Sequence, residues 1–142
     1  MWKVQSLSLP HFCEVFMSEI KEKLLNIQFA RNVWAERRLC RLSPGNNIAR
    51  FKECLEIEDS DKQFGVMEDI IMIMHEAYEV QMKYSGQDYE PFEINHEMMD
   101  ILLNEDEFMG LVQRALAVFD SDGEVSVLAE PKSKKKETTK SI

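Results

Sequence analysis

The chain has 142 residues, of which 26 are acidic and 17 are basic, so its formal net charge is −9. That length fits one domain. A composition of 44% hydrophobic and 30% charged residues is typical of a soluble globular protein, neither disordered nor membrane-embedded. No apolar run approaches the roughly 20 residues that a membrane span needs. The acidic excess also disfavours sequence-independent nucleic-acid binding, which depends on neutralising phosphates. We therefore expect a soluble, acidic domain that binds neither membrane nor nucleic acid.

The N-terminal part of the chain leaves two structures open. We set residues 1–23 apart as a poorly defined segment before a helical domain over residues 24–122. Several apolar residues at the junction fit a short strand: Leu24, Leu25, Ile27 and Phe29. Residues 20–24 fit the start of a helix equally well, and periodicity does not decide between the two. Met17 resembles an alternative translation start, which would make residues 1–16 dispensable.

Two short helices are predicted next. The first lies within residues 31–42 and ends at Ser43-Pro44-Gly45, where proline and glycine both disfavour continuation. The second has Asn46 or Asn47 as its N-cap and ends within residues 58–60.

The longest helix is predicted over about residues 61–84, with Ser60 or Asp61 as its cap. Its apolar residues form two stripes on adjoining faces, which leaves only a narrow polar strip. A helix that is apolar over most of its circumference must be covered on several sides. We therefore place it at the centre of the domain, with the shorter helices around it.

Two further helices are predicted to begin at asparagine caps. Asn95 precedes a short helix, and Asn104 precedes a longer one that runs to about Phe119. Three carboxylates at residues 105–107 lie in the first turn of this last helix, where the helix dipole favours negative charge. The predicted fold class is therefore mainly α, with the short N-terminal strand left open.

The character of the chain changes at residues 123–142, which we predict to be a flexible arm followed by a basic tail. Residues 132–142 contain five basic residues and one acidic residue, a net +4 that leaves −13 on the rest of the chain. The tail's basic cluster is Lys132, Lys134, Lys135 and Lys136. We expect this tail to make any contact with an anionic partner.

The candidate catalytic and metal motifs are all incomplete. His75-Glu76 lacks the second histidine of a zinc-protease helix. Glu93 and His96 have the spacing of carboxylate-bridged metal sites, but the second such pair is missing. Residues 120–123 resemble half of a calcium loop without its outer carboxylates. No phosphate-binding loop or serine-hydrolase elbow occurs, so we predict no catalytic residues, no metal and no cofactor.

The three cysteines indicate a reducing compartment. Cys13, Cys40 and Cys54 are odd in number and widely spaced, with no Cys-x-x-Cys pair. Neither a disulfide framework nor a zinc knuckle can be built from them. We expect reduced thiols in a cytosolic protein.

The nine methionines suggest where a partner binds. Core packing accounts for most of them, but Met72 and Met99 fall outside the main apolar stripes of their helices. An exposed apolar patch on a small acidic domain usually marks a partner site. We predict a groove between the central and last helices, near Met72, Met99, Phe108 and Met109.

The order and length of these elements carry a family resemblance. From Leu24 to Phe119 the sequence gives a small helix through Trp34 and Glu36, a turn at residues 43–47, a second small helix, a long helix, the step EPFEINHEMMDIL and a last amphipathic helix. This layout resembles the tail assembly chaperones of long-tailed bacteriophages and prophages. The N-terminal stretch and the basic tail are departures from the family pattern.

The resemblance implies a small, helical, non-enzymatic protein of the host-cell cytoplasm. Such proteins coat the apolar tape-measure protein, keep it soluble and recruit tail-tube subunits to it, and they are absent from the finished virion. Family members often have a second, longer product made by ribosomal frameshifting, with which the run at residues 134–136 is compatible. Self-association is a further open expectation.

The main alternative is a small acidic regulatory or adaptor protein that binds one protein partner. A helix-turn-helix DNA-binding protein is disfavoured, because no recognition helix free of acidic residues follows the arginines of residues 31–41. An adaptor is expected to form one stoichiometric complex, whereas a chaperone is expected to bind at many copies per tape-measure chain.

Overall fold

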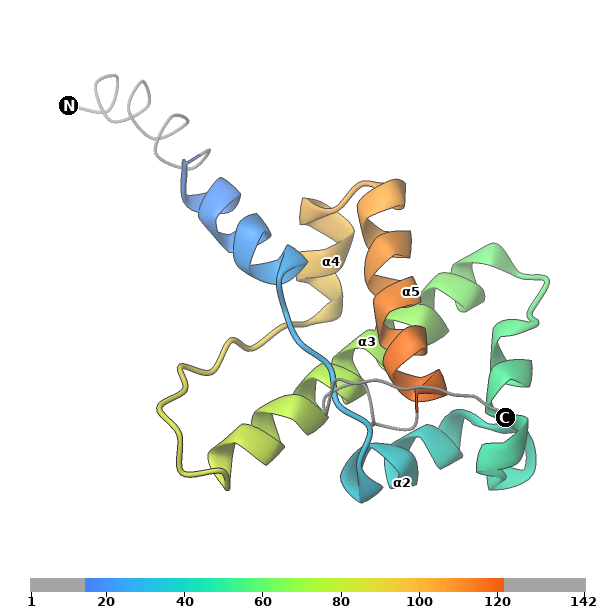
Figure 1. Ribbon diagram of the computed structural model, residues 1–142. Coiled ribbons are helices and arrows are strands. Elements are labelled where there is room, and N and C mark those ends of the chain that lie inside the picture. Colours follow the sequence, from blue (N-terminus) through green and yellow to red (C-terminus); the bar gives the residue numbers. More distant parts are fainter. Residues whose placement is uncertain (1–14, 122–142) are drawn as a thin grey trace, which may run out of the picture.

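The computed structural model describes residues 15–121, and the structured part of this range is helical (Figure 1). A helical segment over residues 15–25 comes first. The elements that follow are α2 (Val33–Leu42), η1 (Pro44–Asn46), η2 (Ile48–Leu55), α3 (Ser60–Lys83), α4 (His96–Leu102) and α5 (Glu105–Asp120). The mainly α fold class is confirmed. The predicted domain boundaries at residues 23 and 122 stay predictions, because residues 1–14 and 122–142 lie outside the described range.

The strand alternative for the N-terminal part is not realised within residues 15–121. Leu24 and Leu25 end the helical segment, and Leu24 is fully buried. Residues 27–30 are extended, but they lie on helices rather than on another strand. The Ala30 amide donates to the carbonyl oxygen of Met74 on α3 at 3.0 Å. Without a neighbouring strand, this extended connection cannot form a ladder.

Side-chain caps start the helices α2, α3, α4 and α5. Asn32, Asn95 and Asn104 accept from main-chain amides at the starts of α2, α4 and α5. Asn104 and Glu107 form a reciprocal capping box, with bonds of 2.8 and 3.0 Å. The cap of α3 is Asp59, one residue before the predicted positions. These caps satisfy amides that have no partner inside the helix.

The second short helix differs in type from the prediction. Asn47 caps it as expected, but residues 48–55 form a 3₁₀-helix that is kinked at Arg50. The preceding turn places Gly45 at φ 63° and Asn46 at φ 54°. Glycine and asparagine tolerate this left-handed conformation best, which explains the tight reversal after Pro44.

The longest described helix, α3, carries much of the core. It contacts α2, η2, α4 and α5. Its fully buried residues include Ile70, Ile71, Met74 and Ala77. The opposing side chains include Leu24, Leu39, Phe51, Leu111 and Val112. Burial on this scale is the main force that holds the fold together.

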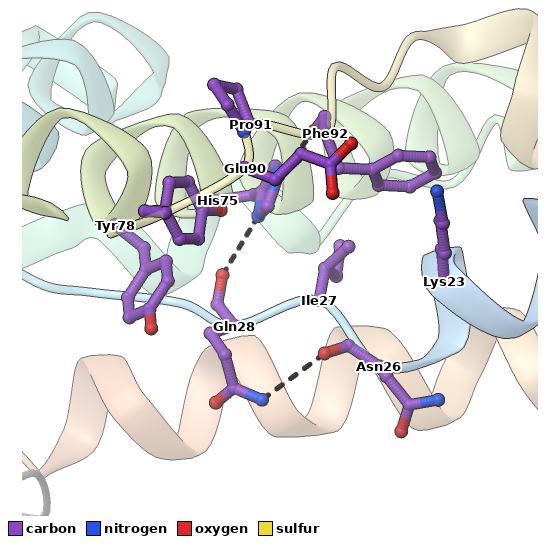
Figure 2. A pocket seen from close by; sticks show the side chains of 10 residues that line it. Lys23, Asn26, Ile27, Gln28, His75, Tyr78, Glu90, Pro91 and Phe92 are labelled. Carbon is purple, nitrogen blue, oxygen red and sulfur yellow. Dashed lines mark hydrogen bonds between the residues drawn. The ribbon is translucent and has the colours of Figure 1, made fainter. Parts of the chain in front are cut away.

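The extended connection before α2 is fixed by hydrogen bonds to two helices. Arg114 of α5 donates to the carbonyl oxygens of Leu25 and Ile27, and Arg31 donates to that of Phe119. Figure 2 shows the connection lying between α3 and α5. These bonds give the connection one defined path, and that path forms a wall of the hollow described next.

Candidate functional site

The predicted partner-binding residues occupy two kinds of position. Met99 and Phe108 are buried, with exposed fractions of 2% and 5%. Met72 and Met109 are half-buried and pack against the same core. The structure brings Met99 and Phe108 together in one hollow, which Met72 and Met109 do not line. Whether a partner contacts any of the four stays a prediction.

This hollow, which we call the α4 hollow, lies between the start of α3, α4 and the start of α5. Its volume is about 230 Å³. Its apolar lining residues are Phe64, Met99, Leu103 and Phe108. The rings of Phe64 and Phe108 lie 5.6 Å apart, and Phe64 is 39% exposed. Phe64 is not among the predicted partner-binding residues, although it is the first apolar residue of the α3 stripe and is exposed near the start of the helix.

Carboxylates dominate the polar lining of the α4 hollow. Glu68, Asp100 and Glu105 line it. Glu68 is almost completely buried, and this burial is the main reason that the pKa of its carboxyl is raised to about 7. A hydrogen bond with Asp100 contributes to the rise, whereas His96 acts in the opposite direction.

His96 lies between two carboxylates of α3, those of Glu68 and Asp69. Its Nδ1 is hydrogen-bonded to Glu68, and its Nε2 lies 3.0 Å from Oδ1 of Asp69. The hydrogen bond with Glu68 is the main reason that the pKa of His96 is raised. The imidazole therefore contacts two carboxyl groups, and Asp100 joins the cluster as a third through Glu68. The cluster holds more negative charge than His96 can balance.

A second hollow of about 300 Å³ lies further along α3, beside His75 and Tyr78 (Figure 2). Its walls are the connection at residues 26–28, one face of α3 and the loop at residues 89–92. Tyr78 and Tyr89 meet edge to face, with ring centroids 5.8 Å apart. Pro91 and Phe92 complete its apolar side. We call it the His75 hollow.

His75 fixes two walls of this hollow. Its exposed fraction is 2%. Its Nδ1 lies 3.0 Å from the carbonyl oxygen of Gln28, and its Nε2 lies 2.8 Å from that of Phe92. The ring therefore joins the connection at residues 26–28 to the loop at residues 89–92. Figure 2 shows the ring pointing toward Gln28.

Glu79 completes the arrangement around His75. Its Oε2 accepts from the Phe92 amide at 2.6 Å and from the Tyr89 hydroxyl at 3.1 Å, and lies 3.2 Å from Nε2 of His75. Burial and the nearby Glu79 raise the pKa of Tyr89. All three contacts are made by the same carboxylate oxygen of Glu79. Together with His75, this carboxylate holds the loop and the connection on α3.

The histidines of the incomplete catalytic and metal motifs have structural contacts in the folded chain. His75 is held by main-chain carbonyls, and His96 pairs with Glu68 and Asp69 instead of with Glu93. Within residues 15–121, no group of three or more histidine, cysteine, aspartate or glutamate side chains is arranged to hold a metal ion. Asp120 forms an ion pair with Lys52 at 2.6 Å, and Gly123 of the calcium-like motif is not among the described residues.

The cysteines and the tail are only partly covered by the described range. Cys40 and Cys54 are free thiols, and burial raises the pKa of Cys54. Cys13 and the basic cluster at Lys132, Lys134, Lys135 and Lys136 lie outside the described residues. Among the helices of residues 15–121, none has the length and apolar character to cross a membrane.

No family model, no curated protein and no solved structure matches the chain. The functional conclusion therefore depends on the residues themselves and on the layout of the elements.

Proposed function

We propose that this chain is a tail assembly chaperone of a long-tailed bacteriophage or prophage. It binds the tape-measure protein without chemistry, keeps that protein soluble and helps to recruit tail-tube subunits. The observation that carries the proposal is the α4 hollow, an apolar floor edged by carboxylates on an acidic helical domain. Its volume is below the range usual for small-molecule sites, which favours the side chain of a protein partner.

The charge of the chain supports binding at many copies. Residues 1–131 carry a formal net charge of −13. Copies that line up along one apolar partner would each add negative charge, which keeps the assembly soluble and limits association between assemblies. The order of the elements from α2 to α5 is the order on which the resemblance to tail assembly chaperones depends.

Co-expression tests the proposal. The partner is the tape-measure protein expected from a long reading frame beside the gene of this chain. With the full chain present, the tape-measure protein should move from the pellet to the soluble fraction. Light scattering should then give many copies of this chain per tape-measure chain.

Two outcomes would contradict the proposal. One is a tape-measure protein that stays insoluble at any ratio. The other is a soluble complex with one copy of this chain, which would favour the adaptor alternative. Bovine serum albumin expressed at a matched level serves as the acidic, non-specific control.

A further inference from the structure

The charged residues that line the α4 hollow are all acidic. Glu68 stands at its inner wall, while Asp100 and Glu105 stand at its exposed edge. His96 approaches Glu68 from α4 and also contacts Asp69, but it is not part of the lining. A partner that enters this space meets negative charge with no cation of this chain beside it in the lining.

The floor of the hollow provides an apolar contact beside that charge. Phe64 and Phe108 present two neighbouring rings, with Met99 and Leu103 below them. A volume of about 230 Å³ is small, so it suits one or two side chains of a partner. Aromatic rings also attract a cation placed over their faces, and they pack against the methylene stem of arginine or lysine.

We propose that the α4 hollow binds a basic amphipathic helix, with an apolar side chain on Phe64 and a neighbouring arginine or lysine on the acidic edge. Arginine suits this site best, because its planar fork can pair with two carboxylate oxygens while its stem covers a ring. The inference rests on the proposed function only in taking the tape-measure protein as the source of such a helix.

Charge complementarity favours this occupant over the others. A nucleic acid would bring phosphates to Asp100 and Glu105 at the exposed edge, and like charges repel. A second copy of this chain would bring the same acidic edge to itself in a two-fold contact. An uncharged apolar helix would cover the floor but would leave the carboxylates without a counter-charge, at a cost in desolvation.

Peptide binding to the full chain tests the inference. The probe is a synthetic amphipathic helix with leucine on one face and arginine on its flanks, and a matched peptide replaces each arginine by glutamate. Calorimetry and NMR chemical shifts should show that the arginine peptide binds and the glutamate peptide does not. The shifts should be concentrated at the start of α3, in α4 and at the start of α5.

Matched variants locate the contact. Phe64→Ser should weaken the arginine peptide about tenfold, whereas Val33→Ser, at a site that is 73% exposed on α2, should leave it unchanged. Glu105→Gln should weaken binding and flatten its salt dependence. Asp106→Asn, which removes a charge from the same first turn of α5 outside the hollow, should do neither.

The inference would be overturned by equal binding of the two peptides, by no binding of either, or by equal effects of Phe64→Ser and Val33→Ser. Its failure can be told from failure of the proposed function. If the chain solubilises the tape-measure protein but no peptide binds at the α4 hollow, only the inference is wrong. If the peptide binds there but the tape-measure protein stays insoluble, only the proposed function is wrong.

Discussion

Two histidine–glutamate pairs involve α3, one within the helix and one between α3 and α4, and they differ in how their charges are balanced. Both ring nitrogens of His75 and Oε2 of Glu79 have hydrogen-bond partners from the chain itself. His96 and Glu68 have two further carboxyl groups beside them, Asp69 and Asp100. The first pair therefore fixes the structure, whereas the second leaves negative charge that a partner can neutralise. The following experiments test this difference.

The largest effect is expected from removing the buried histidine. His75→Ala removes the contacts of the ring with the carbonyl oxygens of Gln28 and Phe92 and with Glu79. We expect the free energy of unfolding to fall by about 3 kcal/mol, measured by urea denaturation of the full chain. Glu76→Ala, at an exposed site on the same helix, is the control and should change it by less than about 0.5 kcal/mol. Similar values for the two variants would refute the structural role of His75.

The acidic cluster should give stability an inverse dependence on pH. The folded chain holds a proton on Glu68 up to about pH 7, whereas the unfolded chain loses it near 4.5. The folded state therefore binds more protons in this range, and its stability should fall as the pH rises from about 4.5 to about 7.

Glu68→Gln is the variant that isolates the contribution of Glu68 to the pH dependence of stability. Parallel denaturation series across the same pH range should show a smaller decline than in the unsubstituted chain. An unchanged decline would show that another group causes it.

A moderate effect of opposite sign is expected at Asp100. At pH 8, Asp100→Asn replaces a repelling carboxylate by an amide that can donate to Glu68. We expect the free energy of unfolding to rise by about 1 kcal/mol. At pH 5.5 the gain should vanish, because Glu68 is then protonated. A loss of stability at both pH values would mean that the cluster is balanced in the same way as the His75 set.

The smallest effect should come from the tyrosine that contacts Glu79. Tyr89→Phe removes one donor but leaves the Phe92 amide and His75 in place. We expect a loss of about 0.5 kcal/mol by thermal denaturation, with no change in binding at the α4 hollow. Tyr84→Phe, at a site that is 79% exposed, is the matched control. A large loss for Tyr89→Phe would indicate that the hydroxyl is the main support of the loop.

Local patterns were enough to predict most of the helices. Asn47, Asn95 and Asn104 are caps as expected, because a cap depends on residues within one turn. The predicted helix ends fall close to those of α3 and α5. The kinked 3₁₀ geometry of residues 48–55 was not predicted, because periodicity does not separate it from an α-helix.

Contacts between residues far apart in the chain could not be predicted from the sequence. The bond between His75 and Gln28 joins residues 47 positions apart, and that between His96 and Glu68 joins residues 28 apart. Met99 is out of register on its own short helix, yet it is buried at 2% because α4 packs onto α3. A single-helix pattern predicts which face is apolar, but not which neighbour covers it.

Hydrogen exchange on the full chain, with and without the tape-measure protein, tests the central claim most directly. If the α4 hollow is the contact, amides at the start of α3, in α4 and in the first turns of α5 should exchange more slowly in the complex. Amides at residues 26–30 and 89–92, around His75, should be unchanged. Protection around His75 with none at the α4 hollow would contradict the account.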